Sequence, residues 1–365
     1  MTDFVVIGGG IAGVSAAAHL APHGSVTLLE TERTLAFHTT GRSAAMYVAN
    51  YGGQGTRPLG VASKAFLEAP PAGSADAPLL SDRGLLWVAD QARTRLLEEK
   101  AADTGSTLID ASEVIRLVPG IRPGWVAGGL YEPRALDIDV AGLHQAFVRI
   151  ARSHRADLRT SAPVTGLIRR NDGWRVAIPG GHVDCGAVVN ASGAWGDVVA
   201  EMAGIDPIGL QPMRRTAFMV PGDDDYSAWP FVVDVEERFY FRPDGAQILC
   251  SLAEETPSLP TDPRPEMADI ALAIERINEA TTLGIRTVRS QWTGLRTFAP
   301  DREMVLGEEP GTRGFFWLVG QGGTGIQTSP AAGALVAALV TGTPPPPQLG
   351  AAGVDAGRYA PARFR

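Results

Sequence analysis

The N-terminal part of the chain combines two short apolar runs with a glycine-rich turn and a helical stretch. Residues 4–7 are four apolar residues in a row, which predicts a short buried strand. Residues 11–20 carry mostly small and apolar side chains and predict a helix, and residues 26–29 predict a second buried strand that leads into Glu30. The pattern therefore predicts a β–α–β unit. The turn between its first strand and its helix contains Gly8, Gly10 and Gly13, with Ile11 and Ala12 between the last two.

The rest of the chain alternates in a similar way between apolar runs and turns. Residues 137–154 place apolar side chains at helical spacing and predict an amphipathic helix. Residues 315–319 predict a strand, which is followed by a second glycine-rich turn at 320–329 and a small-residue helix over 330–340. Prolines at 344–347 end this helix and predict an exposed tail. The other predicted elements are strands within 163–191 with turns at 171–173 and 179–181, strands at 214–221, 239–242 and 247–252, a loop at 254–264 and a helix at 266–282.

Composition and charge narrow the class of protein. The chain has 365 residues, of which 45% are hydrophobic and 20% are charged, as in ordinary globular proteins. A net charge of −8 without any Lys/Arg-rich run argues against a nucleic-acid partner. No apolar run reaches the roughly 18 residues of a transmembrane segment. Because the glycine turn begins by residue 8, there is no room for a cleavable signal peptide before it. We therefore expect a cytoplasmic protein.

The chain has two cysteines, Cys185 and Cys250, which are too few for a disulfide framework or a thiolate metal site. Both lie in apolar runs that resemble strands, so we expect them to be buried and unreactive. The sequence shows neither a metal-ligand spacing nor a Ser/His/Asp arrangement. We expect no metal site.

The glycine turn has a physical role in binding a dinucleotide. Glycines allow a tight turn and let a pyrophosphate approach the first backbone N–H groups of a helix, where the helix dipole favours an anion. An acid about 20 positions farther on accepts hydrogen bonds from a ribose, and Glu30 has this place. Strand, glycines, helix, second strand and acid occur in the expected order. The sequence therefore predicts an adenine dinucleotide, which leaves nicotinamide and flavin enzymes to be distinguished.

Three further segments favour FAD. Residues 37–45 form a hydroxyl- and glycine-rich loop with one arginine, and such a loop can follow the diphosphate and ribityl chain of FAD. The glycine turn at 320–329 lacks a following strand with a terminal acid, so it does not predict a second dinucleotide. It instead offers a helix N-terminus that would stabilise negative charge on a reduced flavin. Residues 187–195 predict a buried strand that ends in small residues, and this segment resembles the strand that brings the middle of the chain back beneath the FAD in flavin enzymes.

With these segments together, the chain resembles the D-amino-acid oxidase superfamily of FAD enzymes, which includes glycine oxidase, sarcosine oxidase and D-amino-acid dehydrogenases. The resemblance extends to about residue 340 and is strongest to the bacterial D-arginine dehydrogenases. Four strings carry it: Thr40-Gly41-Arg42-Ser43-Ala44-Ala45, Leu210-Gln211-Pro212 with Arg214-Arg215, Trp292-x-Gly294-Leu295-Arg296, and Gln321-Gly322-Gly323-x-Gly325-Ile326-Gln327-Thr328.

The resemblance implies an α/β (α+β) fold in which a Rossmann-like FAD-binding domain is interleaved with an antiparallel-sheet substrate domain. The FAD-binding domain is expected at residues 1–50, 138–205 and 297–365. The substrate domain is expected at residues 51–137 and 206–296. The cofactor-binding residues implied are Gly8, Gly10, Ile11, Ala12, Gly13, Glu30, Thr40, Gly41, Arg42, Ser43, Ala44, Ala45, Val164, Ser192, Gly193, Trp195, Gly325, Ile326, Gln327 and Thr328. The FAD is expected to be non-covalently bound, because neither cysteine lies in a flavin-facing motif.

The resemblance also implies how a substrate is held. Arg215 and Arg296 match arginines that bind the substrate carboxylate, and a planar guanidinium suits a carboxylate better than a lysine does. Tyr51 and Tyr240 match tyrosines whose hydroxyl groups close the site. Arg214 would point to the other face of the strand that carries Arg215, so we expect a structural role for it.

The chain departs from the D-arginine enzymes at three pocket positions. Leu85 stands in place of the acid that pairs with a cationic side chain, Met46 in place of a histidine, and Thr324 in place of a tyrosine near the glycine turn, beside Gly323. An unpaired buried guanidinium costs several kcal/mol. These departures predict an apolar pocket that prefers neutral or apolar substrates.

The implied activity is FAD-dependent oxidative deamination of a D-amino acid by hydride transfer to flavin N5, which gives a 2-oxo acid and ammonia after hydrolysis of the imine. Oxidation of a 2-hydroxy acid or an N-substituted amino acid on the same fold is an alternative. A non-catalytic flavin-binding subunit of a larger complex is another. The electron acceptor, quinone or oxygen, stays open. A pyridine-nucleotide disulfide reductase is excluded, because the sequence has neither a close cysteine pair nor a second full fingerprint.

Overall fold

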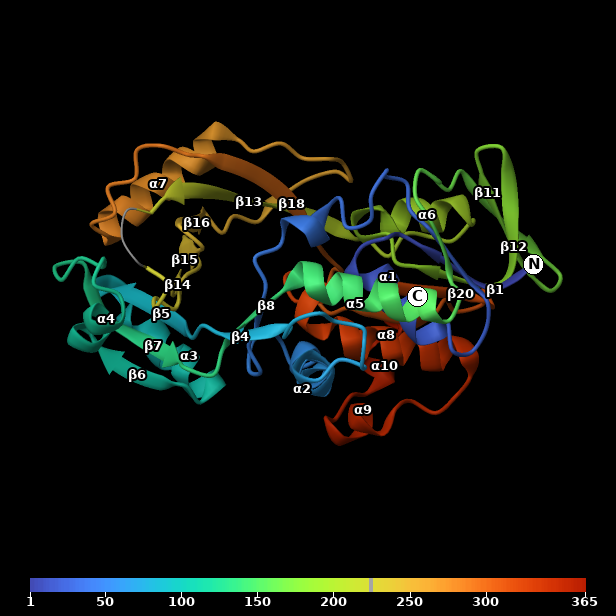
Figure 1. The fold of residues 1–365 in the computed structure, drawn as a ribbon, viewed down its shortest axis with the longest axis horizontal. Helices are drawn as coiled ribbons and strands as arrows, with labels where there is room; N and C mark the ends of the chain where they lie inside the picture. The colour runs from blue at the N-terminus through green and yellow to red at the C-terminus, as the bar shows by residue number, and fades with distance from the viewer. Residues whose placement is uncertain (223–225) are drawn as a thin grey trace.

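The computed structural model describes residues 1–222 and 226–365. It has two lobes side by side, each built around its own β-sheet (Figure 1). Strands β13 (Gln211–Pro221) and β18 (Ser290–Phe298) are long, and they run together from one lobe into the other. They are paired antiparallel along most of their length. The expected α/β fold is confirmed.

The first sheet has eight strands, with β1 (Thr2–Ile7) near its centre. β1 lies parallel to β2 (Val26–Leu29) on one side and to β12 (Gly181–Asn190) on the other. In this register Ile7 lies opposite both Leu29 and Asn190. The carboxyl ends of the three strands therefore meet at one edge, where open α/β sheets bind ligands. The remaining strands are β9 (Asp157–Arg159), β10 (Gly166–Arg170), β11 (Gly173–Ile178), β19 (Val305–Glu308) and β20 (Phe315–Val319).

A layer of helices covers one face of the first sheet. Helix α1 (Ile11–Leu20) packs between α5 (Val140–Ser153) and α8 (Gly325–Thr341). The approach of α1 and α8 requires small residues, because a Cβ added to Gly333 would lie 2.7 Å from Ser15 Oγ. The small side chains predicted for both helices thus serve close packing. The short helix α6 (Gly196–Met202) contributes to the apolar core on the other face.

Helix α2 (Thr56–Glu68) also packs on α8, and its Leu59 and Leu67 are fully buried in the core of the first lobe. It belongs to the range 51–137 that we expected in the substrate domain. The domain ranges stay a prediction, but we propose that α2 be counted with the first lobe, because its apolar face has its partners there.

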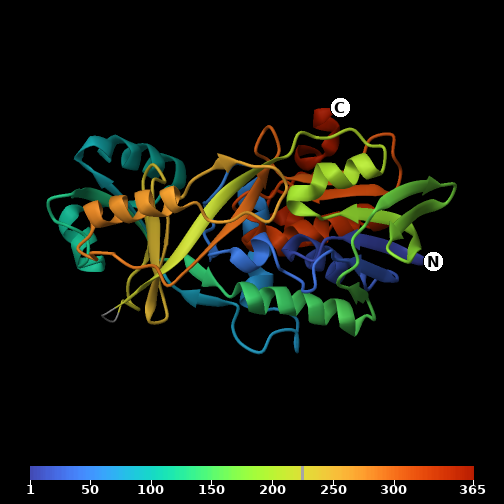
Figure 2. The same cartoon turned by 90° about the horizontal axis from the view of Figure 1, so that it is seen from above.

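The second sheet has nine strands in the order β17-β13-β16-β15-β14-β5-β7-β6, with β18 beside β13. Figure 2 shows from above how helix α7 (Met267–Ala280) lies along this lobe. Apolar cores cover both faces of the sheet. Its other elements are β5 (Leu85–Asp90), α3 (Thr94–Thr104), β6 (Thr107–Asp110), α4 (Ala111–Leu117), β7 (Val126–Glu132), β14 (Phe231–Asp234), β15 (Tyr240–Asp244), β16 (Gln247–Ser251) and β17 (Thr256–Pro257).

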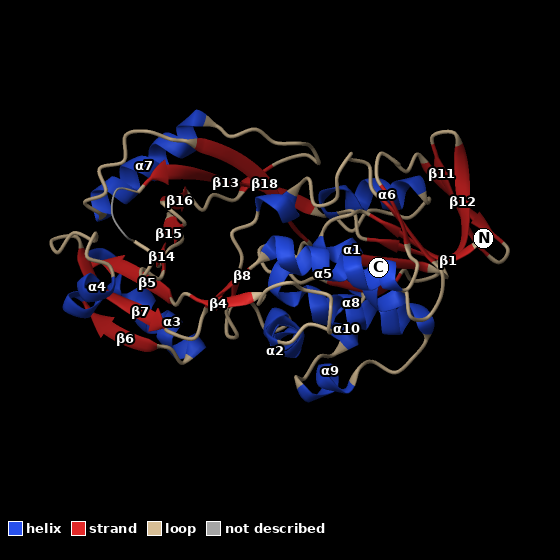
Figure 3. Ribbon diagram, viewed as in Figure 1, coloured by secondary structure: helices blue, strands red, loops and turns tan. Residues whose placement is uncertain are grey.

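A small third sheet lies where the chain passes between the lobes (Figure 3). Its strands are β3 (Met46–Tyr47), β4 (Leu80–Asp82) and β8 (Leu136–Ile138). The sequence analysis did not predict it, because its strands are only two or three residues long. In this sheet β3, which follows the 37–45 loop, pairs with β8, which comes just before α5.

The C-terminal segment differs from the exposed tail that the prolines predicted. It forms the short helices α9 (Pro347–Ala351) and α10 (Ala356–Tyr359) and packs back on the first lobe. Tyr359 is buried, and its hydroxyl donates a hydrogen bond of 2.5 Å to the carbonyl of Gly55. The prediction is confirmed only in part: many residues of this segment are exposed, but Leu349 and Tyr359 are buried against the first lobe.

Both cysteines are buried and free, as expected. Burial raises the pKa of Cys185 to about 12 and raises the pKa of Cys250 as well. Within residues 1–222 and 226–365, no group of three or more His, Cys, Asp or Glu side chains is placed to hold a metal ion. None of the helices in these described ranges has the length and apolar character needed to cross a membrane.

Candidate active site

A cavity of about 570 Å³, which we call the first cavity, lies where the parallel strands of the first sheet end. It extends from the first glycine turn to β13, β15 and β18 of the second sheet. The first cavity is therefore lined by residues of both lobes. The expected site residues that line it are Gly8, Gly10, Ile11, Ala12, Glu30, Thr40, Arg42, Ser43, Ala44, Ala45, Val164, Ser192, Gly193, Trp195, Arg215, Tyr240, Arg296, Gly323, Gly325 and Ile326.

Two glycines of the turn are required by close backbone contacts. Gly8 has a φ of +109°, and a Cβ added to it would lie 2.5 Å from the carbonyl oxygen of Ala191. A Cβ on Gly13 would lie 1.8 Å from the carbonyl oxygen of Gly8. Gly13 therefore supports the turn from below and does not line the cavity. The turn leaves the start of α1 exposed to the cavity, where an anion is favoured.

The Glu30 carboxylate is held under this turn by backbone donors. The N–H of Gly9 donates to Glu30 Oε2 at 2.6 Å, and the N–H of Glu32 donates to Oε1 at 2.9 Å. These bonds fix the carboxylate at the cavity wall, beside the end of β2. This is the place where the dinucleotide motif puts the acid that binds a ribose.

The loop after β2 fastens the two lobes together at the first cavity. Residues Thr39–Arg42 form a turn of 3-10 helix, and Thr40 Oγ1 accepts a hydrogen bond of 2.9 Å from the N–H of Ile11. Arg42 donates to the carbonyl of Thr293 on β18 at 2.7 Å and to Asp262 at 2.6 Å. The predicted role of Arg42 was contact with the cofactor chain. Its guanidinium also anchors this loop to the second sheet.

Some expected cofactor residues lie behind the lining. Gly41 allows a tight turn, because a Cβ there would lie 2.3 Å from the carbonyl oxygen of Ala36. Gln327 is buried in α8 and accepts a hydrogen bond from the N–H of Val48 at 3.0 Å. Thr328 is fully buried and donates to the carbonyl of Thr324 at 3.0 Å. These side chains support the walls.

The sequence analysis missed polar residues at the far end of the first cavity. His38 lies 3.0 Å from Glu32 and packs against Trp195, with ring centroids 4.7 Å apart. All three line the cavity. The sequence did not identify Glu32 and His38 as site residues, because they reach the cavity only through their contact with each other and with Trp195, which is distant in sequence.

The first cavity fits FAD. It has a glycine turn at a helix N-terminus for the diphosphate, a fixed acid for the ribose, and small residues at the second glycine turn. A side chain could not replace Gly8 without meeting the backbone of Ala191, so the turn packs closely on the end of β12 and borders the cavity with backbone alone. The residues that would hold FAD are those that line the cavity from Gly8 to Ile326.

The pairing of β13 and β18 places Arg215 and Arg296 side by side. Arg296 lies opposite Met213, two residues from Arg215, so both arginines are on the same face of the sheet as diagonal neighbours. Arg214 points to the other face, where it pairs with Glu266 at 2.7 Å and with Asp269 at 2.6 Å. This arrangement agrees with the structural role expected for Arg214.

Arg215 is 8% exposed and partly paired. It donates to the carbonyl of Glu254 at 2.9 Å and approaches the Glu255 carboxylate at 3.4 Å. Burial, and after it the neighbouring Arg296, lower the pKa of Arg215. Two neighbouring cations, one buried and one half-buried, favour an anion between them.

Tyr240 and Tyr51 lie near these arginines from different elements. Tyr240 lines the first cavity from β15, and its ring packs on Phe231 at 5.2 Å between centroids. Burial raises the pKa of Tyr51, and the nearby Glu237 raises it further. The Tyr51 phenol thus stays protonated at neutral pH. The hydroxyl groups of both tyrosines lack a hydrogen-bond partner within residues 1–222 and 226–365.

A second cavity of about 330 Å³ adjoins the first. It shares Arg296, Gln321 and Gly323 with the first cavity, and it is also lined by Tyr51 and Thr324. Arg296 thus faces both the expected cofactor space and an adjoining space of substrate size. The charged residues Glu237 and Glu255 of this lining were missed by the sequence analysis, which assigned residues 254–264 to a polar loop without a role.

Leu85 and Met46 line neither cavity. Leu85 is 4% exposed and belongs to an apolar core that also contains Tyr240, and Met46 and Tyr51 pack against the same core. Leu85 and Met46 therefore contact the core that supports the tyrosines and do not face either cavity. The apolar pocket that the sequence predicted at these positions stays a prediction.

Comparison with known proteins indicates the same cofactor as the first cavity does. The family model for FAD-dependent oxidoreductases matches residues 3–339. Glycine oxidase from Bacillus licheniformis is 26% identical over 355 residues, which cover 94% of each chain. Mitochondrial dimethylglycine dehydrogenase from Mus musculus is 28% identical over 260 residues, which cover 68% of this chain. The chain spans 30 to 40% of the length of the dimethylglycine dehydrogenases that it matches.

Solved structures with the same fold cover the whole chain. L-proline dehydrogenase from P. horikoshii has a TM-score of 0.85 at 21% identity and covers 100% of this chain and 97% of its own. Glycine oxidase from Geobacillus kaustophilus has a TM-score of 0.84 at 23% identity and covers 98% of each chain. With the family match over most of the sequence and a cavity that fits a dinucleotide, the chain belongs to the family of FAD-dependent oxidoreductases, and FAD is its cofactor.

Proposed function

We propose that this enzyme oxidises the C–N bond of a small amino acid whose carboxylate is bound by Arg215 and Arg296. The carrying observation is the β13–β18 register, which puts both guanidinium groups on one face, where they line the same cavity as the glycine turn. A carboxylate accepts charge-assisted hydrogen bonds from such a pair. The substrate would then be anchored where the two cavities meet.

The residues around the arginines would orient the substrate and limit water. Tyr240 lines the first cavity and Tyr51 the second, so each has a hydroxyl available for hydrogen bonds to the substrate. The apolar core behind them keeps the arginines in a low-dielectric setting, which strengthens their attraction to a carboxylate. Bound FAD supplies a two-electron acceptor for the hydride of the substrate carbon. The imine product would then be hydrolysed by water.

The sequence resemblance favours a D-amino acid with a neutral or apolar side chain, and we propose this as the first substrate class. A second class is favoured by the relatives, which include dimethylglycine dehydrogenase, sarcosine dehydrogenase and glycine oxidase. N-methylated glycines and glycine carry the same carboxylate and differ at the amine, so the arginine pair does not separate them from a D-amino acid.

Anaerobic bleaching of the flavin absorbance tests the proposal. The purified holoenzyme would be mixed with D- and L-amino acids, sarcosine, dimethylglycine and 2-hydroxy acids in turn. We expect bleaching by at least one amino acid and none by the matching 2-hydroxy acid. Bleaching by 2-hydroxy acids alone would contradict oxidation of a C–N bond. Ammonia release would identify primary amines as substrates.

We also propose that FAD is held without a covalent bond. Both cysteines are buried away from the lining of the first cavity. Acid precipitation should therefore leave the yellow colour in the supernatant. Colour that stays with the protein pellet would contradict the proposal.

A further inference from the structure

The second cavity is lined by an unusual number of charged side chains. Glu255, on its wall, is paired on two sides: Arg302 donates to it at 2.8 Å, and Arg215 approaches it at 3.4 Å. Its charge is therefore balanced before any ligand binds. The charged residues of the lining are Glu237, Glu255, Arg296, Asp301, Arg302 and Glu303.

Two more of these carboxylates are paired with the C-terminal segment. Arg363 donates to Asp301 at 2.6 Å, and Arg358 donates to Glu303 at 3.1 Å. These ion pairs are partly exposed, and they fix the rim of the cavity. They add no uncompensated charge to its interior.

Glu237 and Arg296 are the two charged groups of the lining that stay unpaired. The side chain of neither residue forms a hydrogen bond or an ion pair within the described ranges 1–222 and 226–365. They have opposite signs and line one cavity. Charges that face a partly closed space without a partner are costly, unless a ligand of complementary charge occupies that space.

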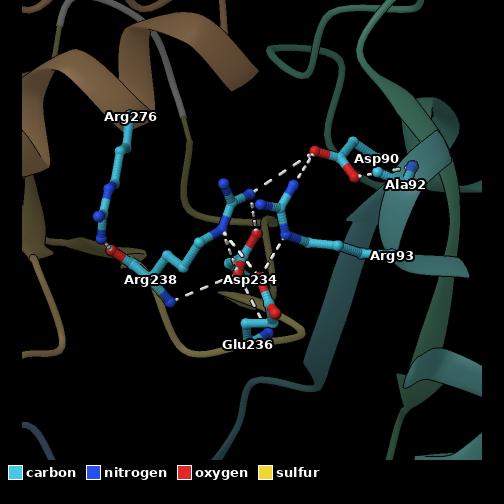
Figure 4. Close-up of polar contacts among 7 residues, drawn as sticks. All are labelled: Asp90, Ala92, Arg93, Asp234, Glu236, Arg238 and Arg276. Carbon is cyan, nitrogen blue, oxygen red and sulfur yellow. Dashed lines mark hydrogen bonds and ion pairs between the residues drawn. The ribbon is translucent and has the colours of Figure 1, made fainter. Parts of the chain in front are cut away.

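The turn that carries Glu237 is held firmly by its neighbours (Figure 4). Asp234 is fully buried and accepts two hydrogen bonds from the Arg238 guanidinium, at 3.0 and 2.7 Å. The Glu236 carboxylate pairs with Arg93 on the side away from the cavity lining. All the charged side chains of this turn except Glu237 thus belong to the network.

The backbone of the turn also sets the direction of Glu237. Its N–H donates to the carbonyl of Asp234 at 2.7 Å, and its φ is +54°, a left-handed conformation that is uncommon for a residue with a side chain. Such strain persists where the surrounding structure fixes it, and it is frequent at functional sites. The Asp234–Arg238 pair supplies that constraint here.

Glu237 and Arg296 also act on a common neighbour. After burial, Glu237 is the largest influence that raises the pKa of Tyr51, and Arg296 acts on the same phenol in the opposite direction. Both charges are therefore within electrostatic reach of Tyr51, which also lines the second cavity.

We propose that Glu237 binds the cationic amine of the substrate whose carboxylate is bound by Arg296, so that the second cavity recognises an amino-acid zwitterion. This inference rests on the proposed function for the identity of the ligand. A zwitterion satisfies the two unpaired charges at once, whereas a 2-hydroxy acid satisfies Arg296 alone. Glu237 would thus distinguish amines from hydroxy acids.

Binding to the holoenzyme tests the proposal through the change in flavin absorbance on titration. The probes are D-alanine, sarcosine and D-arginine, with propionate as a carboxylate that lacks an amine. Glu237→Gln should weaken binding of D-alanine and sarcosine by about ten- to a hundredfold, because it removes one charge-assisted hydrogen bond. Propionate should bind Glu237→Gln at least as tightly as it binds the unmodified enzyme.

Glu236→Gln is the matched control, since it removes the same charge from the same turn but outside the cavity lining. It should leave all four affinities within about twofold. A loss confined to D-arginine would place Glu237 beside the substrate side chain instead of the amine and would overturn the proposal. Equal weakening of amino acids and propionate, or no weakening in Glu237→Gln, would overturn the proposal.

The outcome is separable from the proposed function. If no amine bleaches the flavin, the proposed oxidation fails, but the comparison of D-alanine with propionate still measures whether Glu237 recognises an amine. If amines bleach the flavin and Glu237→Gln binds them as the unmodified enzyme does, only the role of Glu237 fails.

Discussion

The two cavities of this enzyme are built by different means. The first is formed by strand ends, glycines and backbone donors, and its charged Glu30 is held by backbone N–H groups. The second is lined by charged side chains from segments far apart in sequence, and most of them have ion-pair partners within the lining or in the C-terminal segment. A cofactor site can therefore be specified by a local motif, whereas the substrate site depends on which charges the fold leaves unpaired.

This difference predicts that substitutions will separate into two classes. Changes in the first cavity should act on FAD retention, because they alter backbone geometry. Changes in the second should act on ligand binding at unchanged FAD content, because they alter the charge of side chains.

The largest effect is expected at the glycine turn. Gly8→Ala should leave the purified protein with little bound FAD, because the added Cβ meets the Ala191 carbonyl at 2.5 Å and the φ of +109° disfavours any side chain. Gly180→Ala is the control, since that glycine also has a positive φ of +79° but has open space at its Cβ. The measurement is the ratio of FAD to protein. Full FAD content in Gly8→Ala would contradict the claim that backbone geometry in the first cavity determines FAD retention.

A somewhat smaller effect is expected at the arginine that both cavities share. Arg296→Met should raise the substrate concentration needed for flavin reduction by about two orders of magnitude, since a charge-assisted pair contributes about 3 kcal/mol. FAD content should not change. Arg302→Met serves as the control, because Arg302 lines the second cavity but is already paired with Glu255. Normal reduction by Arg296→Met would place the carboxylate site elsewhere.

The apolar core behind the tyrosines gives a third test. Leu85→Glu should lower the melting temperature by several degrees and give no preference for D-arginine, because Leu85 is 4% exposed and lines neither cavity. Ser81→Glu, on exposed strand β4, is the control for added charge. The ratio of kcat/KM for D-arginine to that for D-leucine is the measurement. A shift toward D-arginine would return Leu85 to the substrate pocket, where the sequence analysis put it.

The smallest effect concerns pH and the helix layer beneath the first cavity. His19 on α1 packs beside Phe66 and Phe147, and burial lowers its pKa from 6.5 to about 4. The unfolded chain therefore takes up this proton first as the pH falls, so the stability that the neutral imidazole contributes is lost between about pH 6.5 and 4. At pH 5.5 we expect a loss of about 1 kcal/mol.

Thermal unfolding at pH 7.5 and pH 5.5 measures this loss, and His19→Leu should show a smaller difference between the two than the unmodified protein does. The exposed His154 provides the control substitution. An equal pH dependence in His19→Leu and the unmodified protein would assign the acid sensitivity to other groups.

The strand–turn–helix unit at the N-terminus could be predicted because its information is local. The predicted strand, helix and second strand correspond to β1, α1 and β2 within two residues at every end. The start of α8 was predicted five residues too late, because Pro330 was taken as its first residue. In the structure, Ser329 Oγ donates to the Ile326 carbonyl at 2.9 Å and satisfies the acceptor that proline leaves free.

The charged cavity could not be predicted in this way. Asp301 and Glu303 look like ordinary surface acids in the sequence, and their partners are about sixty positions away in a segment that prolines marked as a tail. Glu237 is a candidate binding residue because its carboxylate, alone among the charged side chains of its turn, has no ion-pair partner within the described residues. Its significance depends on the whole set of ion pairs, which no local pattern contains.

The central position of β1 has a consequence for how the enzyme assembles. β1 pairs with β12, more than 170 residues later, and β12 pairs with β20, more than 120 residues after that. Such contacts give a high contact order and make folding slow, because long loops must close before they form. A fragment that contains the complete glycine motif but ends before β12 has no neighbour on one side of β1. It should bind no FAD, so the most recognisable part of the sequence becomes functional only after the most distant strands have joined it.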